Sequence, residues 1–299
     1  MEFGPQAIEN TAWAFATLPW EHGGPLLQAI SSAARRRMPD FGPHECANTA
    51  WAFSTLPVAD RPLLAAISSA ARSTMAEFRM LELSSPAWAF ATLLVRDVPL
   101  LNSIAAAARR SISAASTQSL ANTPWAFAPL RVMDAPLLEA ISSASIATMS
   151  EFAPQALANT AWAIATLSVP HNEPLPDAIA SQAIRRISEF QPTELATLAW
   201  SCSQLAVAHE PLLEAIASES LHMLARGRMG SLAAGMVLQG LACVEDLSLA
   251  LQHLQRLDRL GLQPGSLGLG VLLGALERQP SELGHEVRLL RGLLARGRG

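Results

Sequence analysis

Arginines recur along this sequence at a fixed spacing. Arg35, Arg72 and Arg109 are separated by steps of 37 residues, and other arginines flank equivalent positions. If the segments that carry them stack side by side, the guanidinium groups form a ladder, and such groups suit a chain of phosphates. The candidate phosphate-binding residues are Arg35, Arg36, Arg72, Arg109, Arg110, Arg185 and Arg186. The alternative is that these cations only offset the negative ends of helices, each contributing about 0.3–1 kcal/mol.

An asparagine three residues before a tryptophan is the second recurring feature. The pairs are Asn10 and Trp13, Asn48 and Trp51, Asn122 and Trp125, and Asn159 and Trp162. Ser85 and Thr197 replace the asparagine in the third and sixth units. An amide can bind a base edge while an indole stacks on a base, as in readers of single-stranded RNA. We favour the other interpretation, in which the indole fills the groove between two helices and the asparagine binds the backbone of the adjacent repeat.

No residue pattern indicates catalysis, a cofactor or a metal site. Cys46, Cys202 and Cys243 are far apart and form no Cys-x-x-Cys pair, so they are interpreted as reduced thiols. The histidines lack the spacing of metal ligands, and a phosphate-binding loop of the Gly-Lys-Ser/Thr type is excluded because the sequence contains no lysine. We therefore expect a protein that is not an enzyme.

The spacing of the tryptophans indicates the elements that position these side chains. Six of the seven tryptophans recur every 37–38 residues, namely Trp13, Trp51, Trp88, Trp125, Trp162 and Trp200. A fixed period of this length predicts an all-α fold, an α-solenoid of helix-turn-helix repeats. In each repeat the first helix carries the tryptophan, and the second opens at a proline.

Aspartates mark the start of the second helices. Asp60, Asp97 and Asp134 each stand two residues before a proline, an arrangement typical of an N-cap followed by a first turn. We expect six tryptophan-containing repeats in residues 1–225. Residues 226–299 have no such tryptophan and are rich in leucine and glycine, so we expect looser, degenerate repeats or a cap there.

The composition limits the kinds of partner. Half of the residues are hydrophobic, only 15% are charged, and the net charge is −4, so binding to nucleic acid must depend on local arrangement. Serine pairs such as Ser31–Ser32, Ser68–Ser69 and Ser142–Ser143 give the second helices a weakly charged outer face. This pattern leaves open an armadillo- or HEAT-like scaffold for protein–protein interaction. The apolar stretch 260–276 contains a proline and several glycines, so we expect no membrane span.

The start of the chain matches the interior of a repeat, because Glu2-Phe3-Gly4-Pro5-Gln6 parallels Glu151-Phe152-Ala153-Pro154-Gln155. We therefore expect a fragment of a longer protein, and no targeting peptide is visible.

The segment Pro154–Leu167, with its Pro-Gln-x-Leu-Ala-Asn-x-x-Trp-Ala core, resembles the octotricopeptide repeat family of algal organelle proteins. It is also similar to the helical repeats of FAST-kinase-like and RAP-domain proteins. The resemblance implies an α-solenoid that binds single-stranded RNA and acts in RNA processing, stability or translation. It further implies a location in the mitochondrion or chloroplast.

Overall fold

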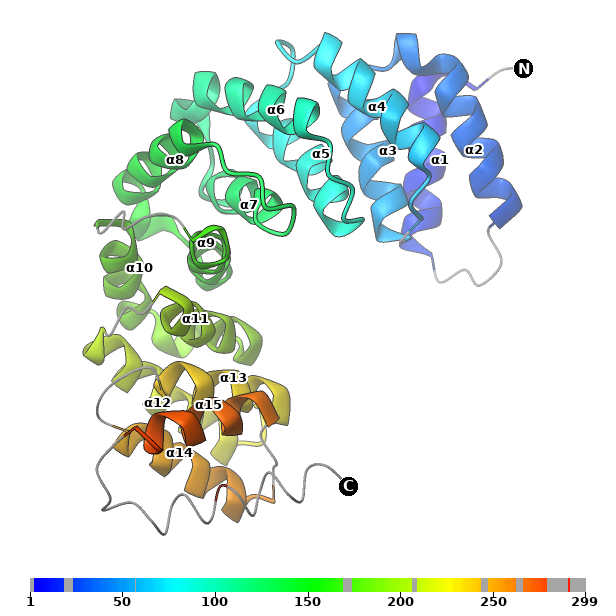
Figure 1. Cartoon of the computed structure of the whole chain (residues 1–299). Coiled ribbons are helices and arrows are strands. Elements are labelled where there is room, and N and C mark those ends of the chain that lie inside the picture. Colours follow the sequence, from blue (N-terminus) through cyan, green and yellow to red (C-terminus); the bar gives the residue numbers. More distant parts are fainter. Residues whose placement is uncertain are drawn as a thin grey trace. The chain divides into compact units, whose positions relative to one another are not determined.

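The computed structural model describes residues 3–18, 24–56, 58–168, 174–205, 209–242, 247–261, 266–278 and 290. Every regular element in these residues is helical, which confirms the all-α prediction (Figure 1). The chain divides into two compact units, Met1–Ala147 and Thr148–Gly299. Within each unit the helices alternate between two kinds, which we call A helices and B helices. In the described part of the chain, no helix combines the length and the apolar character that crossing a bilayer requires.

The A helices are α1 (Pro5–Thr17), α3 (Pro43–Thr55), α5 (Met80–Thr92), α7 (Thr117–Phe127), α9 (Pro154–Leu167), α11 (Pro192–Leu205), α13 (Ser231–Leu241) and α15 (Ser266–Leu276). The B helices are α2 (Gly24–Arg37), α4 (Arg61–Ser73), α6 (Val98–Ser111), α8 (Ala135–Ala147), α10 (Pro174–Arg185), α12 (Glu210–Ala225) and α14 (Ser248–Arg259). Short 3-10 turns follow four of the B helices, namely η1 (Met38–Asp40), η2 (Ile112–Ala114), η3 (Met149–Glu151) and η4 (Ile187–Glu189).

Helices of the same kind pack on one another. In the first unit α1, α3, α5 and α7 form one layer and α2, α4, α6 and α8 form the other. In the second unit α9, α11, α13 and α15 form one layer, and α10, α12 and α14 form the other (Figure 1). This packing of each element on the equivalent element of the next repeat is the arrangement of a helical solenoid, as the period predicts.

The A helices approach one another closely because small residues face their neighbours. Ala47, Ala50 and Ala87 are at most 2% exposed on α3 and α5. In the second unit a Cβ atom at Gly240 would lie 2.5 Å from the backbone oxygen of Ala199 on α11. The glycine-rich sequence after residue 225 was expected to indicate looser packing. At Gly240 the glycine instead permits a close approach of two helices, and Gly268 does the same against Gly235.

Phenylalanines supply the large buried side chains. Phe53, Phe90 and Phe127 on A helices are at most 2% exposed, and each stands two residues after a tryptophan. A second set lies in the connections from B helices to A helices, where Phe41, Phe78, Phe152 and Phe190 are at most 7% exposed. The first member of this set, Phe3, is 63% exposed. No repeat precedes it among the described residues, so nothing there covers its ring.

Caps define the turn from each A helix to its B helix. The carboxylates of Asp60, Asp97 and Asp134 accept hydrogen bonds from the third backbone N–H that follows, at 2.9–3.0 Å, which confirms the predicted N-caps. His209 plays the same part for α12 through Nδ1, at 3.2 Å. Because these groups satisfy orphan N–H donors, the B helices start at fixed points.

Three of the A helices, α5, α7 and α9, are followed by a left-handed residue. Leu94, Arg131 and Ser168 occupy the same repeat position and have φ values of 53°, 50° and 49°. The N–H of Val95 donates to the oxygen of Phe90 at 2.8 Å, the six-to-one bond of a Schellman cap. Glycine normally fills this position because a Cβ atom is unfavourable there.

Replacing Leu94 with glycine should therefore stabilise the protein. Leu94 is 71% exposed, so little apolar burial is lost, while the left-handed penalty of up to about 1 kcal/mol is relieved. Leu94→Ala is the matched control, because alanine keeps the Cβ atom and should give no gain. Urea unfolding followed by circular dichroism measures the difference. An equal change in both variants would show that the backbone conformation is not the cause.

A buried histidine makes the second unit sensitive to acid. His253 on α14 is fully buried, and its Nδ1 lies 3.2 Å from Ser220 Oγ on α12. Burial lowers the pKa of His253 from 6.5 to about 4. Above pH 6.5 the histidine is neutral in both the folded and unfolded states. Below that pH the unfolded state binds the proton first, so stability is lost between pH 6.5 and about 4.

The free energy of unfolding should fall by about 3 kcal/mol across this range because of His253 alone. The measurement is urea unfolding at pH 7 and pH 4.5. His253→Gln should reduce the pH dependence, although it lowers stability at neutral pH. His222→Gln, at an exposed position of α12, is the control and should leave the pH dependence unchanged. If both variants keep the wild-type pH dependence, another group causes it.

Candidate nucleic-acid interface

Each A helix leaves one stripe of side chains uncovered. On α3 the stripe consists of His44, Asn48, Trp51 and Thr55, which follow the helical period and are exposed or partly exposed. We call these positions, together with their equivalents on other A helices, the outer stripe. Its other members are Gln6, Asn10, Trp13 and Thr17; Leu81, Ser85, Trp88 and Thr92; Gln118, Asn122 and Trp125; Gln155, Asn159, Trp162 and Thr166; and Thr193, Thr197, Trp200 and Gln204.

The tryptophans of the outer stripe are partly buried rather than enclosed. Trp13 is 50% exposed, and the other five are intermediate. The fully enclosed aromatic side chains of the repeats are phenylalanines such as Phe53, while the indoles lie at the margin of the groove between helices. An indole that packs on one side and meets solvent on the other can stack on an aromatic ligand.

The asparagines lie on the same surface, beside the indoles. Asn10 is exposed, while Asn48, Asn122 and Asn159 are partly exposed. The Asn48 amide donates to the carboxylate of Glu9 on α1, so it binds a side chain of the adjacent repeat, not its backbone. Within the described residues the other three asparagines make no hydrogen bond through their amides. They remain available to a ligand.

One part of the outer stripe was missed in the sequence. The first-turn position of each A helix is exposed or partly exposed and differs between repeats, as His44, Leu81 and Gln118 illustrate. The tryptophan and asparagine positions hardly vary. Variation at a regularly spaced helical position could have indicated a surface, but the strong tryptophan period drew attention away from it.

The arginines of the first unit lie in the last turns of neighbouring B helices. Arg35, Arg72 and Arg109 are exposed on α2, α4 and α6, which pack in that order. Arg72 Nε donates to the backbone oxygen of Ser68 at 3.3 Å, which turns part of the guanidinium back onto its own helix. Among the described residues, Arg35 and Arg109 form no ion pair. We call the set Arg35, Arg36, Arg72, Arg109 and Arg110 the basic edge.

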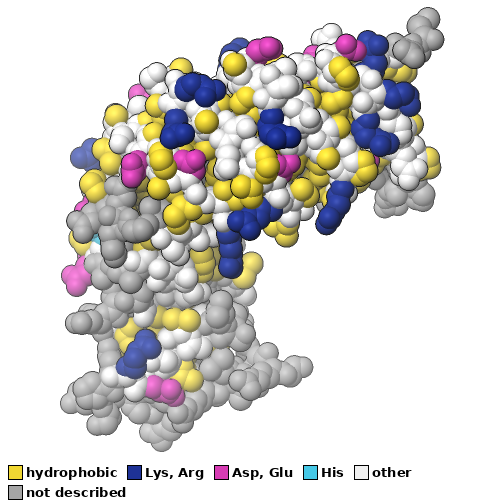
Figure 2. Space-filling model, turned by 45° about the horizontal axis from the view of Figure 1, so that its top comes forward, with side chains coloured by type: hydrophobic (Ala, Val, Ile, Leu, Met, Phe, Trp, Pro, Cys, Tyr) yellow, Lys and Arg dark blue, Asp and Glu magenta, His cyan; other side chains and the backbone are white. Residues whose placement is uncertain are grey.

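The basic edge lies where each B helix connects to the next A helix. The positive N-terminal ends of A helices and the negative C-terminal ends of B helices meet at this end of the repeat, so the arginines themselves supply the positive potential there. On the face of the first unit that Figure 2 shows, arginine side chains project at intervals among apolar and uncharged side chains and a smaller number of acidic ones. This distribution provides separate contact points, as a chain of phosphates would need.

The second unit contains a different arrangement of arginines. Arg185 is exposed at the end of α10. Arg186 Nη1 donates to the backbone oxygen of Phe152 at 2.6 Å, and its guanidinium also pairs with Glu189. The hydrogen bond from Arg186 holds the pKa of Glu189 below its usual value. Arg186 therefore anchors the connection between helices, which argues against a phosphate contact there.

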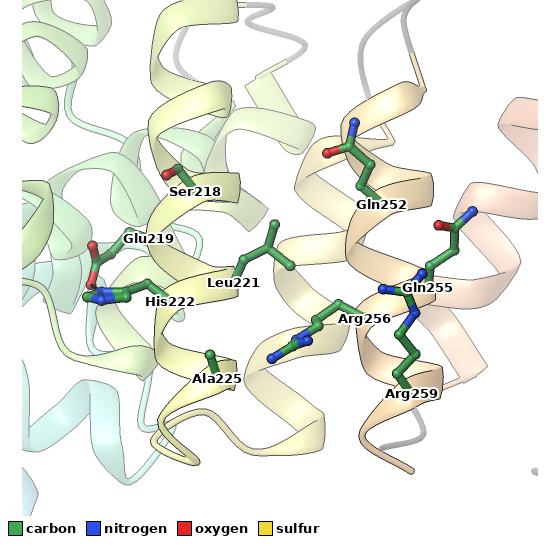
Figure 3. Close-up of a pocket in the computed structure, with 9 residues that line it drawn as sticks. All are labelled: Ser218, Glu219, Leu221, His222, Ala225, Gln252, Gln255, Arg256 and Arg259. Carbon is green, nitrogen blue, oxygen red and sulfur yellow. Dashed lines mark ion pairs between the residues drawn. The ribbon is translucent and has the colours of Figure 1, made fainter.

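A hollow of about 720 Å³ between α12 and α14 contains two arginines that the repeat spacing did not reveal. Arg256 extends from α14 toward α12, and Arg259 ends beside Gln255 (Figure 3). The side chains of Glu219 and His222, whose nearest oxygen and nitrogen are 3.7 Å apart, point away from α14 (Figure 3). These arginines occupy the last turn of a B helix, and only a search for basic last turns beyond the final tryptophan repeat would have found them.

Only the second serine of each pair lies toward the outer face of its B helix. Ser31, Ser68 and Ser142 are at most 3% exposed, so they belong to the interior. Their neighbours Ser69 and Ser143 are exposed. The serine pairs therefore do not form the uncharged outer surface expected for a protein scaffold.

The two cysteines that the structure describes are buried. Burial raises the pKa of the Cys46 thiol to about 12, so it is not a nucleophile near neutral pH. Cys202 is also buried, and Cys243 lies outside the described residues. In the part of the chain that the structure describes, no group of three histidine, cysteine or acidic side chains could hold a metal ion.

The sequence was compared with known protein families and with curated proteins. The sequence profile of the RNA-editing substrate-binding complex 6 protein family matches residues 7–238. A search of curated proteins gave no match. The family match corrects the resemblance drawn from the segment Pro154–Leu167. The assignment to the octotricopeptide repeats of algal organelle proteins is wrong, because the recurring Asn–Trp phrase belongs to a different family.

The different burial of neighbouring aromatic residues gives a test of the outer stripe. Phe127→Ala should cost about 3–5 kcal/mol of unfolding free energy, because the ring is 2% exposed. Trp125→Ala, two residues earlier on α7, should cost clearly less, because part of the indole meets solvent. Urea unfolding of both variants provides the comparison. A larger loss of unfolding free energy in the tryptophan variant would show that the indole is a core residue.

Proposed function

Because the chain belongs to the RNA-editing substrate-binding complex 6 protein family, we propose that it binds single-stranded RNA as a non-catalytic subunit of such a complex. The proposed compartment is the mitochondrion. The chloroplast, the other organelle expected from the sequence, gains no support from the family match. The observation that carries the proposal is the outer stripe, where partly exposed indoles recur beside asparagine amides.

The outer stripe has the chemistry that unpaired bases need. Base stacking on an aromatic side chain contributes about 1–3 kcal/mol per base and tolerates any base. The asparagine three residues earlier lies on the same helix face, within reach of a base edge. Duplex RNA would hide the faces of its bases in its own stack, so the surface favours single strands.

The basic edge supplies contacts to phosphates. Arg35, Arg72 and Arg109 come from consecutive repeats, so one strand could meet one arginine in each repeat. The net charge of −4 argues against general attraction of nucleic acid. In this proposal affinity depends on the local basic edge together with stacking. We assign a lesser part to Arg186, whose guanidinium already binds Glu189 and Phe152.

Residues 226–299 have a separate place in the proposal. We propose that residues 1–225 form the RNA-binding repeats and that the remainder forms degenerate repeats which cap the array. The family match ends at residue 238, close to this boundary. The last described tryptophan of the outer stripe is Trp200 on α11, so the aromatic surface does not extend onto α13 or α15.

A second function, the binding of protein partners, is favoured by the opposite edge of the first unit. At the turns from A helices to B helices, Leu18, Leu94 and Met133 are 50%, 71% and 50% exposed. Large apolar side chains repeated along one edge are more typical of contact with protein than with phosphate. A complex subunit could use this edge for proteins and the outer stripe for RNA.

Two triple variants with the same change of charge test the RNA interface. One variant replaces Arg35, Arg72 and Arg109 with glutamine. The other replaces the exposed residues Arg61, Arg96 and Arg131 with glutamine. The second set lies at the turns from A helices to B helices, away from the basic edge. Binding of a fluorescent single-stranded RNA is measured by anisotropy over a range of salt concentrations.

The basic-edge variant should bind more weakly, and its slope of log K against log salt should fall by about 2, because each lost phosphate contact removes about 0.7. The control variant should keep nearly the wild-type slope. Equal losses in the two variants would mean that overall charge, rather than the basic edge, drives binding. Absence of RNA binding by the wild-type chain would overturn the proposed function.

A further inference from the structure

Glu9 on α1 is a buried carboxylate at a position that is otherwise small. Glu9 is 3% exposed, and it is the one acidic residue among the buried residues that the structure describes. The equivalent residues of the next three repeats are Ala47, Ser84 and Ala121. A carboxylate out of water is costly unless hydrogen bonds satisfy it. The groups that satisfy Glu9 come from α3, and they belong to the outer stripe.

Two side chains of α3 bind this carboxylate. His44 Nδ1 lies 3.2 Å from Glu9 Oε2, and the amide nitrogen of Asn48 donates to Glu9 Oε1. An ionised carboxylate only accepts hydrogen bonds, so both partners must donate. His44 therefore carries a proton on Nδ1. The amide nitrogen of Asn48 also lies beside the imidazole ring, 3.2 Å from Nε2 and 3.4 Å from Nδ1.

The network decides which atom Asn48 offers to a ligand. The amide nitrogen of Asn48 is directed inward, where it donates to Glu9 and lies beside the imidazole ring of His44. The carbonyl oxygen Oδ1 has no partner among the described residues, and it is not enclosed. It therefore faces solvent as an acceptor. The indole of Trp51, three residues later on the same face, provides a stacking surface next to it.

We propose that the second repeat selects a base with an exocyclic amino group, such as cytosine or adenine, over uracil. An amino group can donate to Asn48 Oδ1 while the base stacks on Trp51. Uracil can donate to Oδ1 only through N3–H, which lies between two carbonyl oxygens, and these oxygens are repelled by Oδ1 and by the nearby charge of Glu9. The amide nitrogen of Asn48 is turned toward Glu9, so it is not presented to a carbonyl of the base. Glu9 and His44 act as positioning residues.

The other asparagines of the outer stripe have no such restraint. On the A helices that precede Asn122 and Asn159, the positions equivalent to Glu9 hold the small residues Ser84 and Ala121. The amides of Asn122 and Asn159 make no hydrogen bond within the described part of the chain. Each can rotate its amide to offer either a donor or an acceptor. They should accept pyrimidines with or without an amino group. Selectivity in this model of binding is concentrated at Asn48.

The test compares oligocytidine and oligouridine, which differ at the base edge but not in size. The proposal rests on RNA binding by the outer stripe, so the full chain is first measured with both oligonucleotides by anisotropy. The wild type should prefer oligocytidine by about 3- to 10-fold, the range expected for one hydrogen bond. Glu9→Gln should remove most of this preference, because glutamine can donate to Asn48 and lets its amide rotate.

Two further variants separate selectivity from folding. Asn48→Ala removes the acceptor without touching Glu9 and should also abolish the preference. Asn122→Ala is the matched control, and it should weaken the binding of both oligonucleotides by similar factors. Circular dichroism melting shows whether each variant is folded at the assay temperature.

The outcomes distinguish the two proposals. If the folded wild type binds both oligonucleotides equally, or if Glu9→Gln and Asn48→Ala keep the wild-type ratio, the selectivity of the second repeat is refuted and RNA binding still stands. If the wild type binds neither oligonucleotide, both proposals fall.

Discussion

The close packing of consecutive A helices is the constraint on which the rest of the structure depends. Alanines such as Ala50 and Ala87 are fully buried between these helices, and Gly240 brings its helix against the backbone of Ala199. Helices packed this closely on both flanks, with B helices behind them, have only one side left for solvent. That side is narrow, and within each unit the repeats present it in the same register. The alignment of Trp13, Trp51 and their equivalents thus follows from how the backbones stack.

The same constraint explains where the large side chains go. Little volume is left between A helices, so bulk is placed between the layers and in the connections, where Phe53 and Phe152 are enclosed. Connections of fixed length, with 3-10 turns such as η1 and η3, then keep the last turn of each B helix beside the first turn of the next A helix. This proximity places Arg35 and Arg109 at the same end as the positive helix termini.

The period, the hairpins and the caps could be predicted from sequence because each depends on local chemistry. Asp60 caps its helix for reasons contained in a few neighbouring residues. The orientation of the A helices could not be predicted in this way, because a helix that is apolar on nearly all sides has no distinct polar face. The sequence-based interpretation therefore placed the indole of Trp51 in the groove between helices without recognising that Phe53 is the fully enclosed ring. The partners of Glu9 also depended on contacts between residues 35 and 39 positions apart.

A repeat array with uniform columns has little means of distinguishing one base from another. Trp51 and Trp162 offer similar stacking surfaces, and an unrestrained amide such as that of Asn159 adapts to whatever lies opposite it. Discrimination requires a departure from the repeat, and the departure must be rigid, because a mobile group adapts just as an unrestrained amide does. Glu9 meets both conditions. Burial makes its charge costly, so its hydrogen bonds to His44 and Asn48 are difficult to give up. The cost of enclosing one carboxylate thereby fixes the direction of one amide on an otherwise permissive surface.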